Sequence, residues 1–442
     1  MKPLFHVADV LQDVLTTTAN SLARTTGVIR RERKFTGASL AQTFILGWLS
    51  NPRATFDELA QMAASCGAAV KPQAVAQRLT STLADFFKQL LEVTTAQVVA
   101  TQPVSVDLLR RFNGVYVQDS TVIKLPDSFA EQYPGCGGGT TGQSNAAVKF
   151  QVQMNLTNGS LVGPFPEAGK SSDQSSCVQH MPLPAGALRI ADLGYFGLKR
   201  LAELAAQGVY WISRIQLQTA VFHDGNLIDL CSWLNKRKIK SIDLPVLVGA
   251  DERLACRLIA VRCPPDVVRR RIAAAKKDAL RRGRTASKAQ LEWCRWTVMI
   301  TNTSVEQLNP TEAIVLYRSR WQIELLFKLW KQHGLVDESR HSSDEAKLVE
   351  IYAKIIGVVI QHWLLIKTVW SYSNRSLIKA SKAIQKHVVL LVAFLQSRIS
   401  AEATFEQIAN TLRSCARIDH RKSRPNTYQI LETPELLGYD MA

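Results

Sequence analysis

The sequence predicts an α/β protein in which helices pack on a mixed sheet and both ends of the chain are helical. Short apolar runs rich in β-branched residues begin near residue 110 and later alternate with a helical pattern, as expected for such a sheet. Apolar residues recur at helical spacing over residues 1–100 and 346–442. A chain of 442 residues is too long for one ordinary hydrophobic core, so we expect several domains.

The N-terminal region carries two helix signals. Thr55 and Glu58 fit a capping box, and the helix that they start runs to a turn at Gly67. A second helix begins near Pro72, so the segment is either a helix-turn-helix that reads DNA or a plain helical hairpin. Arg78, at its end, is a candidate DNA contact. A basic run upstream either binds phosphates or is a solvated face; it consists of Arg30, Arg31, Arg33 and Lys34.

Two of the predicted strands contain or end at an acid. Asp119 lies inside an apolar, β-branched stretch, and the strand over 188–191 runs directly into Asp192. Between them, apolar and polar residues alternate over 148–156, which predicts a half-buried strand. Lys149 on its polar face either faces a site or is exposed to solvent. The Gly-rich loop 134–139 lacks the Lys and Ser or Thr of a phosphate-binding loop, so we interpret it as a hairpin connection.

The second half of the chain contains an apparent insertion between two parts of the core. A helix over 198–207 and a strand over 209–212 precede it, and strand-like pieces, a basic helix from 266 to about 282 and a strand over 296–300 compose it. Ten Lys or Arg residues and three acids lie between 265 and 295. A long helix from about 311 to 332 follows. In the C-terminal region, we predict apolar helices around 350–369 and 386–397 and a capping box that starts another helix at Thr404.

These patterns divide the chain into five predicted segments. They are a helical DNA-binding region (1–105), the first part of the core (106–214), the insertion (215–300), the second part of the core (301–345) and a helical C-terminal region (346–442).

Charge and cysteine usage indicate a nucleic-acid-binding protein of the cytoplasm. The net charge of +17 and the pI near 9.6 favour a polyanionic partner. The eight cysteines include no CxxC pair, and we interpret the CxxH spacing of Cys177 and His180 as non-metal residues. The N-terminus lacks the pattern of a signal peptide, and the apolar stretch 355–366 is too short to span a bilayer. We therefore expect a soluble protein without a membrane partner.

The long predicted helix places four polar side chains on one face. Tyr317, Arg320, Glu324 and Lys331 fall within an arc of roughly 60° at about 100° per residue. Because Arg320 and Glu324 are four residues apart, a solvated salt-bridge stripe is the alternative to a functional site. A lone acid such as Asp119 or Asp192 could equally be a turn or cap residue. Acids that converge from separate elements would instead suit a metal pair for phosphodiester chemistry.

The spacing Tyr-x2-Arg-x3-Glu-x6-Lys, formed by Tyr317, Arg320, Glu324 and Lys331, resembles the YREK signature of the DDE transposases of bacterial insertion sequences. Asp119-Ser120-Thr121 resembles the first acidic motif of that family, and Asp192-Leu193-Gly194-Tyr195-Phe196 is similar to its second. The gap between Asp192 and Glu324 is where cut-and-paste members place a β-rich insertion.

The resemblance implies a ribonuclease-H-like sheet with helices on both faces. It also implies that Asp119, Asp192 and Glu324 bind two Mg²⁺ or Mn²⁺ ions and that Tyr317, Arg320 and Lys331 hold a DNA phosphate. Either Trp293 or Trp296 would stack on a flipped base, with core packing as the favoured alternative. The basic 265–295 segment would neutralise several phosphates.

The partners that the resemblance implies are double-stranded DNA, as element ends and as target, and a second copy of the chain on paired ends. The location would be the cytoplasm of a bacterium, at the nucleoid. Two alternatives to a transposase remain at this point, another ribonuclease-H-like DNA nuclease and a catalytically inactive DNA-binding regulator. Neither explains all the motifs, because a nuclease has no need of Tyr317, Arg320 and Lys331, and a regulator has no need of the acids.

Overall fold

The computed structural model describes residues 3–137, 144–237, 239–418 and 425–437. It divides the chain into two compact units that do not follow the five predicted segments. Unit 1 comprises Met1–Ser105, Asp119–Val178 and Gln322–Arg421. Unit 2 comprises Val106–Gln118, Gln179–Trp321 and Lys422–Ala442.

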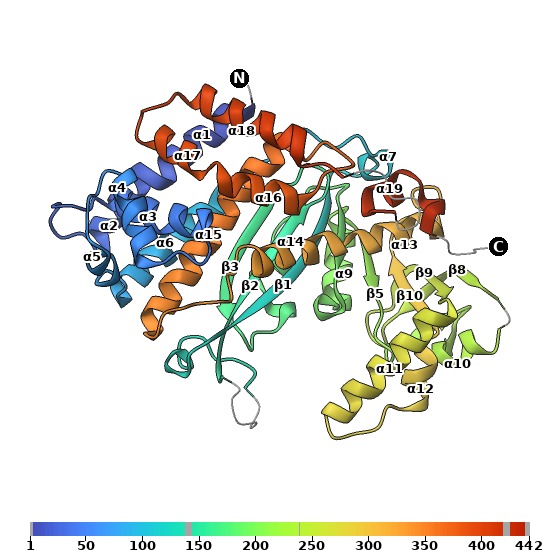
Figure 1. Cartoon of the computed structure of the whole chain (residues 1–442). Coiled ribbons are helices and arrows are strands. Elements are labelled where there is room, and N and C mark those ends of the chain that lie inside the picture. Colours follow the sequence, from blue (N-terminus) through green and yellow to red (C-terminus); the bar gives the residue numbers. More distant parts are fainter. Residues whose placement is uncertain (1–2, 138–143, 238, 419–424, 438–442) are drawn as a thin grey trace. The chain divides into compact units, whose positions relative to one another are not determined.

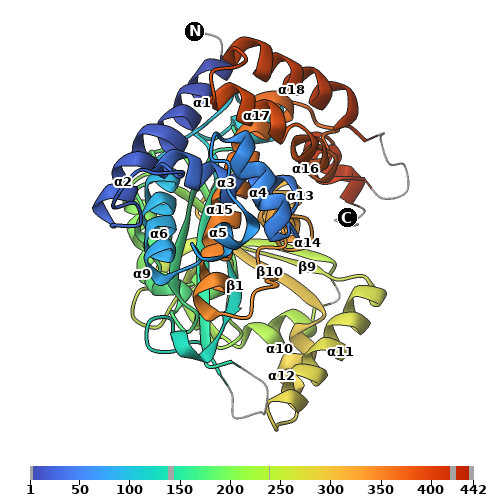
Figure 2. The same ribbon diagram turned by 60° about the vertical axis from the view of Figure 1, so that its left-hand side comes forward.

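Unit 1 is mainly helical and is built around one long apolar helix, α15 (Asp344–Val369). Figure 2 shows α15 among the N-terminal helices, where it packs against α3 and α6. By length and composition α15 could cross a membrane, but its most apolar stretch is completely buried inside the structure, as in the core helix of a soluble protein. The other helices of unit 1 are α1 (Pro3–Gln12), a π-helical turn (Asp13–Thr18), α2 (Ala19–Thr25), α3 (Gly37–Ser50), α4 (Phe56–Ser65), α5 (Pro72–Ala76), α6 (Ser81–Ala96), α14 (Trp321–Gln332), α16 (Leu377–Lys386), α17 (Val388–Leu395) and α18 (Ala401–Cys415).

The strands of unit 1 lie in the order β3–β2–β1, with β1 (Val115–Leu125), β2 (Ala146–Asn155) and β3 (Leu161–Ala168). The alternation in β2 predicted a half-buried strand, and that prediction is wrong, because every residue of β2 is buried. The polar side chains of β2 face a buried polar layer instead of solvent. Gln151, for example, donates hydrogen bonds to Glu167 and Asp173. The described part of the Gly-rich loop fits the predicted hairpin connection, since Pro134 pairs with Ala146; Gly138 and Gly139 lie outside the described residues.

Unit 2 contains the rest of the sheet, in the order β1–β4–β5–β10–β9–β8–β6–β7. Figure 1 labels β5, β10, β9 and β8 of this part. The first three strands of the order are parallel and the others are antiparallel. Its strands are β4 (Leu188–Ala191), β5 (Tyr210–Arg214), β6 (Val221–His223), β7 (Asn226–Ile228), β8 (Ser241–Val248), β9 (Leu254–Arg262) and β10 (Trp296–Thr301). Its helices are α7 (Asp107–Arg110), α8 (Cys177–His180, which begins in unit 1), α9 (Leu198–Ala206), α10 (Leu230–Asn235), α11 (Pro265–Arg281), α12 (Lys288–Trp293), α13 (Pro310–Ser319) and α19 (Thr427–Glu432).

The segment 215–300 extends the sheet of unit 2 instead of forming a core of its own. Trp296 of β10 and Leu258 of β9 belong to the same hydrophobic cluster as Leu204 of α9 and Trp211 of β5. The strands predicted in this segment are confirmed, and so is the basic helix, which is α11.

Two helix boundaries differ from the sequence prediction. The helix predicted over about 311–332 is two helices, α13 and α14, which are separated at Arg320. The capping box predicted at Thr404 is wrong: α18 begins at Ala401, and the Ser400 side chain accepts a hydrogen bond from the Ala403 amide. The capping box of Thr55 and Glu58 at the start of α4 is confirmed.

Candidate active site

Asp119 and Asp192 each follow a paired position of two neighbouring parallel strands. Gln118 of β1 pairs with Ala191 of β4, and the two acids are the next residues of their chains. Most residues of both strands up to this point are buried, and the polar pair Gln118 and Arg189 is hydrogen-bonded. Asp119 accepts a hydrogen bond of 2.8 Å from the amide of Ser120. Both acids therefore directly follow the last residue pair of the parallel β1–β4 ladder.

The part of the site in unit 2 gathers Asp192 with two residues of the signature. Arg320 Nη2 lies 4.0 Å from Asp192 Oδ1, and 46% of the Asp192 side chain is exposed. Burial, assisted by the charge of Asp192, raises the pKa of Tyr317 to about 12, while Arg214 and Arg320 act in the opposite direction. An ordinary tyrosine is already protonated at neutral pH, so the raised pKa only moves the ionisation of the Tyr317 hydroxyl further from neutrality.

The part of the site in unit 1 contains Glu324 and Lys331, both on α14. Glu324 lies in the first turn and Lys331 in the last. Lys331 Nζ donates a hydrogen bond of 2.8 Å to the carbonyl oxygen of Val122, which ties the end of α14 to β1. The predicted single helical face is thus interrupted, since Tyr317 precedes the break at Arg320 and Glu324 and Lys331 follow it.

A buried polar network supports the strand segment that carries Asp119. Its centre is Asp173, whose Oδ1 accepts hydrogen bonds from Lys149 Nζ (3.1 Å), Gln151 Nε2 (3.1 Å) and Ser120 Oγ (3.2 Å). Lys149 also donates to the carbonyl oxygen of Ser171 and is only 9% exposed, so the alternative that it faces solvent is wrong. Sequence reasoning missed Asp173; its signal is the polar run 171–176 directly after a strand.

A second network in unit 2 holds the ends of β1 and β4 and was also missed. Arg189 is 2% exposed, donates from Nε to Gln118 Oε1 at 2.8 Å and from Nη2 to Gln179 Oε1. Gln179 in turn donates to the carbonyl oxygen of Tyr195, in the turn after Asp192. Burial above all, together with Arg200, lowers the pKa of Arg189 to about 9, so it remains charged at neutral pH. The sequence does contain a signal for this network, because Arg189 is a basic residue among the apolar residues of the predicted strand 188–191.

Three residues predicted as possible DNA contacts, Trp296, Trp293 and Arg78, differ in their surroundings. Trp296 is 1% exposed, and its Nε1 donates to Asn235 Oδ1 at 3.0 Å; base stacking by Trp296 is therefore excluded, and its role is core packing. Trp293 is partly buried against the same cluster. The Arg78 guanidinium lies 5.5 Å from the ring centre of Phe35, which places it beside the exposed basic run of residues 30–34.

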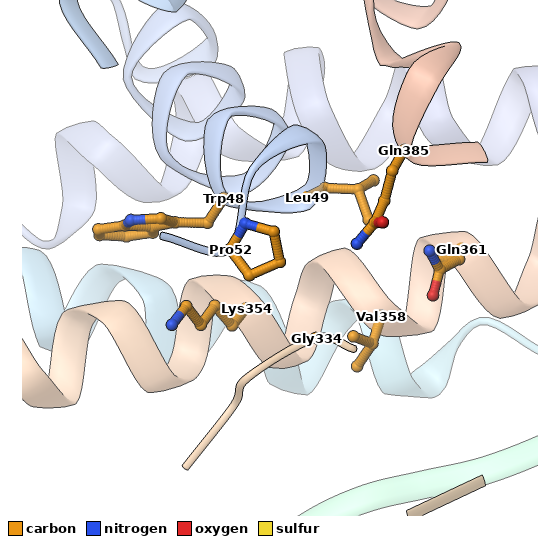
Figure 3. Close-up of a pocket in the computed structure, with 8 residues that line it drawn as sticks. All are labelled: Trp48, Leu49, Pro52, Gly334, Lys354, Val358, Gln361 and Gln385. Carbon is orange, nitrogen blue, oxygen red and sulfur yellow. The ribbon is translucent and has the colours of Figure 1, made fainter. Parts of the chain in front are cut away.

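The donor chemistry of the three predicted ligands suits a hard divalent cation, because all three offer carboxylate oxygens. Asp119 and Glu324 belong to unit 1 and Asp192 belongs to unit 2. Over the described ranges, no three His, Cys, Asp or Glu side chains gather closely enough to hold a metal ion. A small pocket between α3 and α15 does not provide such a site, because no carboxylate lines it (Figure 3).

Comparison with known proteins identifies the family of the chain. A family model described as "Transposase DDE domain" matches residues 110–360. The transposase for insertion sequence element IS231B of Bacillus thuringiensis subsp. berliner is 27% identical over 93% of this chain and 91% of that protein. The IS231D transposase of B. thuringiensis subsp. finitimus is 25% identical with the same coverage, and the IS1151 transposase of Clostridium perfringens is 24% identical over 56% of each chain. Because the family model covers more than half of its length, this chain belongs to the DDE transposase family.

Proposed function

We propose that this DDE transposase cuts double-stranded DNA at the ends of an insertion sequence and joins those ends to target DNA, and that Asp119, Asp192 and Glu324 bind two Mg²⁺ or Mn²⁺ ions. The observation that carries the proposal is the strand register, in which Gln118 pairs with Ala191 immediately before the two aspartates. Membership in the DDE transposase family supports metal binding as the role of this pair of acids. The ions, when bound, activate the attacking oxygen and stabilise the leaving one.

The position of α14 supports Glu324 as the third ligand. The hydrogen bond from Lys331 to the carbonyl oxygen of Val122 holds the last turn of α14 against β1, the strand that carries Asp119. Glu324 lies in the first turn of the same helix.

Three signature residues supply donors for DNA phosphates. Arg320 offers a planar guanidinium next to Asp192, Lys331 offers an ammonium group, and Tyr317 offers a phenolic hydroxyl. These groups hold the strand while water attacks the phosphodiester bond at the element's end. The released 3′-hydroxyl then attacks the target DNA.

DNA recognition is assigned to the helices of residues 1–105. Arg78 lies over the ring of Phe35, which directly follows the exposed basic run from Arg30 to Lys34 in the chain, and these cations are the candidate phosphate contacts. The protein acts in the bacterial cytoplasm at the nucleoid, as a homodimer on paired ends. Among the residues that the structure describes, the one helix long and apolar enough for a membrane is α15, whose most apolar stretch is buried in unit 1.

A cleavage assay on duplexes that carry the element's end tests the proposal. Asp119→Ala, Asp192→Ala and Glu324→Ala should each abolish Mg²⁺-dependent cutting and strand transfer, while gel-shift affinity for the duplex persists. The matched control is Asp251→Ala, which removes an exposed acid from a turn between β8 and β9 and should cut like the wild type. Cutting that survives all three changes would show that other residues form the site. Binding without any cutting by the wild type would instead support a regulator, and cutting without strand transfer a nuclease.

A further inference from the structure

The guanidinium of Arg257, on β9, connects the sheet of unit 2 with the loop that leads into α13. Arg257 pairs with Pro245 of β8 on one side and with Thr301 of β10 on the other. Its Nε and Nη2 donate to the two carboxylate oxygens of Asp243, at 3.0 and 2.7 Å. This bidentate ion pair fixes the plane of the guanidinium and leaves Nη1 for other acceptors.

The Nη1 group of Arg257 binds the loop between β10 and α13. It donates to the carbonyl oxygens of Thr303 at 3.0 Å, Ser304 at 2.7 Å and Leu308 at 3.0 Å. The Arg257 side chain is only 11% exposed, and Thr303 and Leu308 are buried. Because a buried carbonyl group that loses its donor costs free energy, these contacts favour one position of the loop against β9.

A second arginine holds the same loop and the first turn of α13. Arg111, just before β1, donates to both carboxylate oxygens of Glu312 at 2.8 and 2.9 Å and to the carbonyl oxygen of Gln307 at 3.0 Å. Glu312 also accepts from the Asn309 amide in the capping box that starts α13. The Arg111 side chain is 42% exposed, so its ion pair is weaker than the enclosed pair of Arg257.

The helix that these arginines hold carries two residues of the proposed DNA site. Tyr317 lies near the end of α13, and Arg320, its C-cap residue, is 4.0 Å from Asp192. Buried side chains such as Ile314 and Leu316 keep α13 against unit 2, but apolar burial has no preferred direction. Hydrogen bonds are directional. The contacts at the start of α13 therefore define where its far end lies.

We propose that Arg257 is a positioning residue for the reaction, which acts through the loop 303–308 to place Tyr317 and Arg320 beside Asp192. The strands β8 and β9 of the segment 215–300 thereby support the site from within the protein. The role of Tyr317 and Arg320 on a DNA phosphate rests on the proposed function, whereas the clamp rests on the hydrogen bonds of Arg257.

The first measurement is the single-turnover rate of cutting by Arg257→Met on a saturating duplex that carries the element's end. A misplacement of about 1 Å can cost about 100-fold in rate, so we expect a fall of about 10- to 100-fold. Gel-shift affinity for the duplex in EDTA should stay at the wild-type value. Arg257→Lys should recover little of the rate, because an ammonium group cannot form the bidentate pair and the carbonyl contacts together. Full recovery by lysine would show that only the charge matters.

A double-mutant cycle separates positioning from general destabilisation. In a protein that already carries Tyr317→Phe and Arg320→Lys, Arg257→Met should lower the rate far less than in the wild type, because the groups that it positions are already altered. An equal loss in both backgrounds would overturn the proposal.

Hydrogen exchange in EDTA provides a readout that does not require cutting. The amides of residues 311–320 should exchange faster in Arg257→Met and Arg257→Lys than in the wild type. The matched control is Arg253→Met, which removes an exposed arginine before β9 that contacts Phe222 and Ala250; it should exchange and cut like the wild type. Equal exchange in all four proteins would overturn the clamp. A wild type that does not cut would refute the proposed function, while this comparison would still decide the clamp.

Asp243→Asn serves if Arg257→Met does not fold, as judged by circular dichroism. It weakens the ion pair that orients Arg257 and leaves the donors to the loop in place. Its cutting rate should fall less than that of Arg257→Lys, and its α13 amides should exchange faster than those of the wild type. An unchanged rate together with unchanged exchange would count against the proposal.

Discussion

At the scale of single residues, the least expected feature of the site is a buried cation whose hydrogen bonds go to neutral amides. Arg189 donates to the side-chain oxygens of Gln118 and Gln179. Gln118 precedes Asp119, and Gln179 holds the carbonyl oxygen of Tyr195 in the turn that follows Asp192. Burying a charge is costly unless its hydrogen bonds are satisfied. We infer that Arg189 is a positioning residue, which holds the residue before Asp119 and, through Gln179, the turn after Asp192.

Replacing Arg189 with methionine should therefore damage both stability and metal use. Two buried amide oxygens lose their donor, and an unsatisfied buried group costs about 1–3 kcal/mol, so we expect the free energy of unfolding in urea to fall by about 3 kcal/mol. The Mg²⁺ concentration that gives half-maximal cutting should rise, while affinity for a duplex in EDTA stays at the wild-type value. A variant that is destabilised but has an unchanged Mg²⁺ dependence would show that Arg189 only supports the fold.

At the scale of elements, the sequence predicted which segments form helices and strands better than it predicted their edges and partners. The break at Arg320 is invisible to periodicity, because Arg320 keeps right-handed helical dihedrals (φ −51°, ψ −30°) and the apolar spacing continues into α14. Alternation in β2 identified a strand, but it could not reveal that Asp173, some 20 residues later, would bury Lys149 and Gln151. Contacts of this kind, like those of Arg189, depend on tertiary structure and leave little trace in local sequence.

The start of α18 is another element boundary that differs from the sequence prediction, and its N-cap can be tested by mutation. Two Ser or Thr residues compete as N-cap, and the structure selects Ser400, whose side chain accepts from the Ala403 amide, whereas Thr404 is fully buried in the first turn. Ser400→Ala should lower the free energy of unfolding by about 1 kcal/mol, the usual contribution of an N-cap side chain. Ser414→Ala, near the other end of α18, should change it by less than half as much. An equal loss in the two variants would show that Ser400 does not cap the helix.

At the scale of the whole molecule, strand β1 belongs to both compact units. Its first four residues, Val115–Gln118, pair with β4 in unit 2, and the remainder, from Asp119 onward, lies in unit 1. The unit boundary thus falls immediately before the first proposed ligand, and a second boundary falls between Arg320 and Glu324. The proposed ligands are consequently contributed by both units, two by unit 1 and one by unit 2.

The proposed binding of metal ions predicts that divalent metal stabilises the folded protein. A ligand that binds only the folded state at 100 times its Kd adds about 2.7 kcal/mol to the free energy of unfolding. Thermal unfolding of the wild type should therefore shift to higher temperature as Mg²⁺ is added at constant ionic strength, and EDTA should reverse the shift. Asp192→Ala removes the only ligand from unit 2 and should lose most of the shift, whereas Asp251→Ala should retain it. An equal Mg²⁺ shift in the wild type and in Asp192→Ala would place the stabilising metal elsewhere and remove Asp192 from the proposed ligand set.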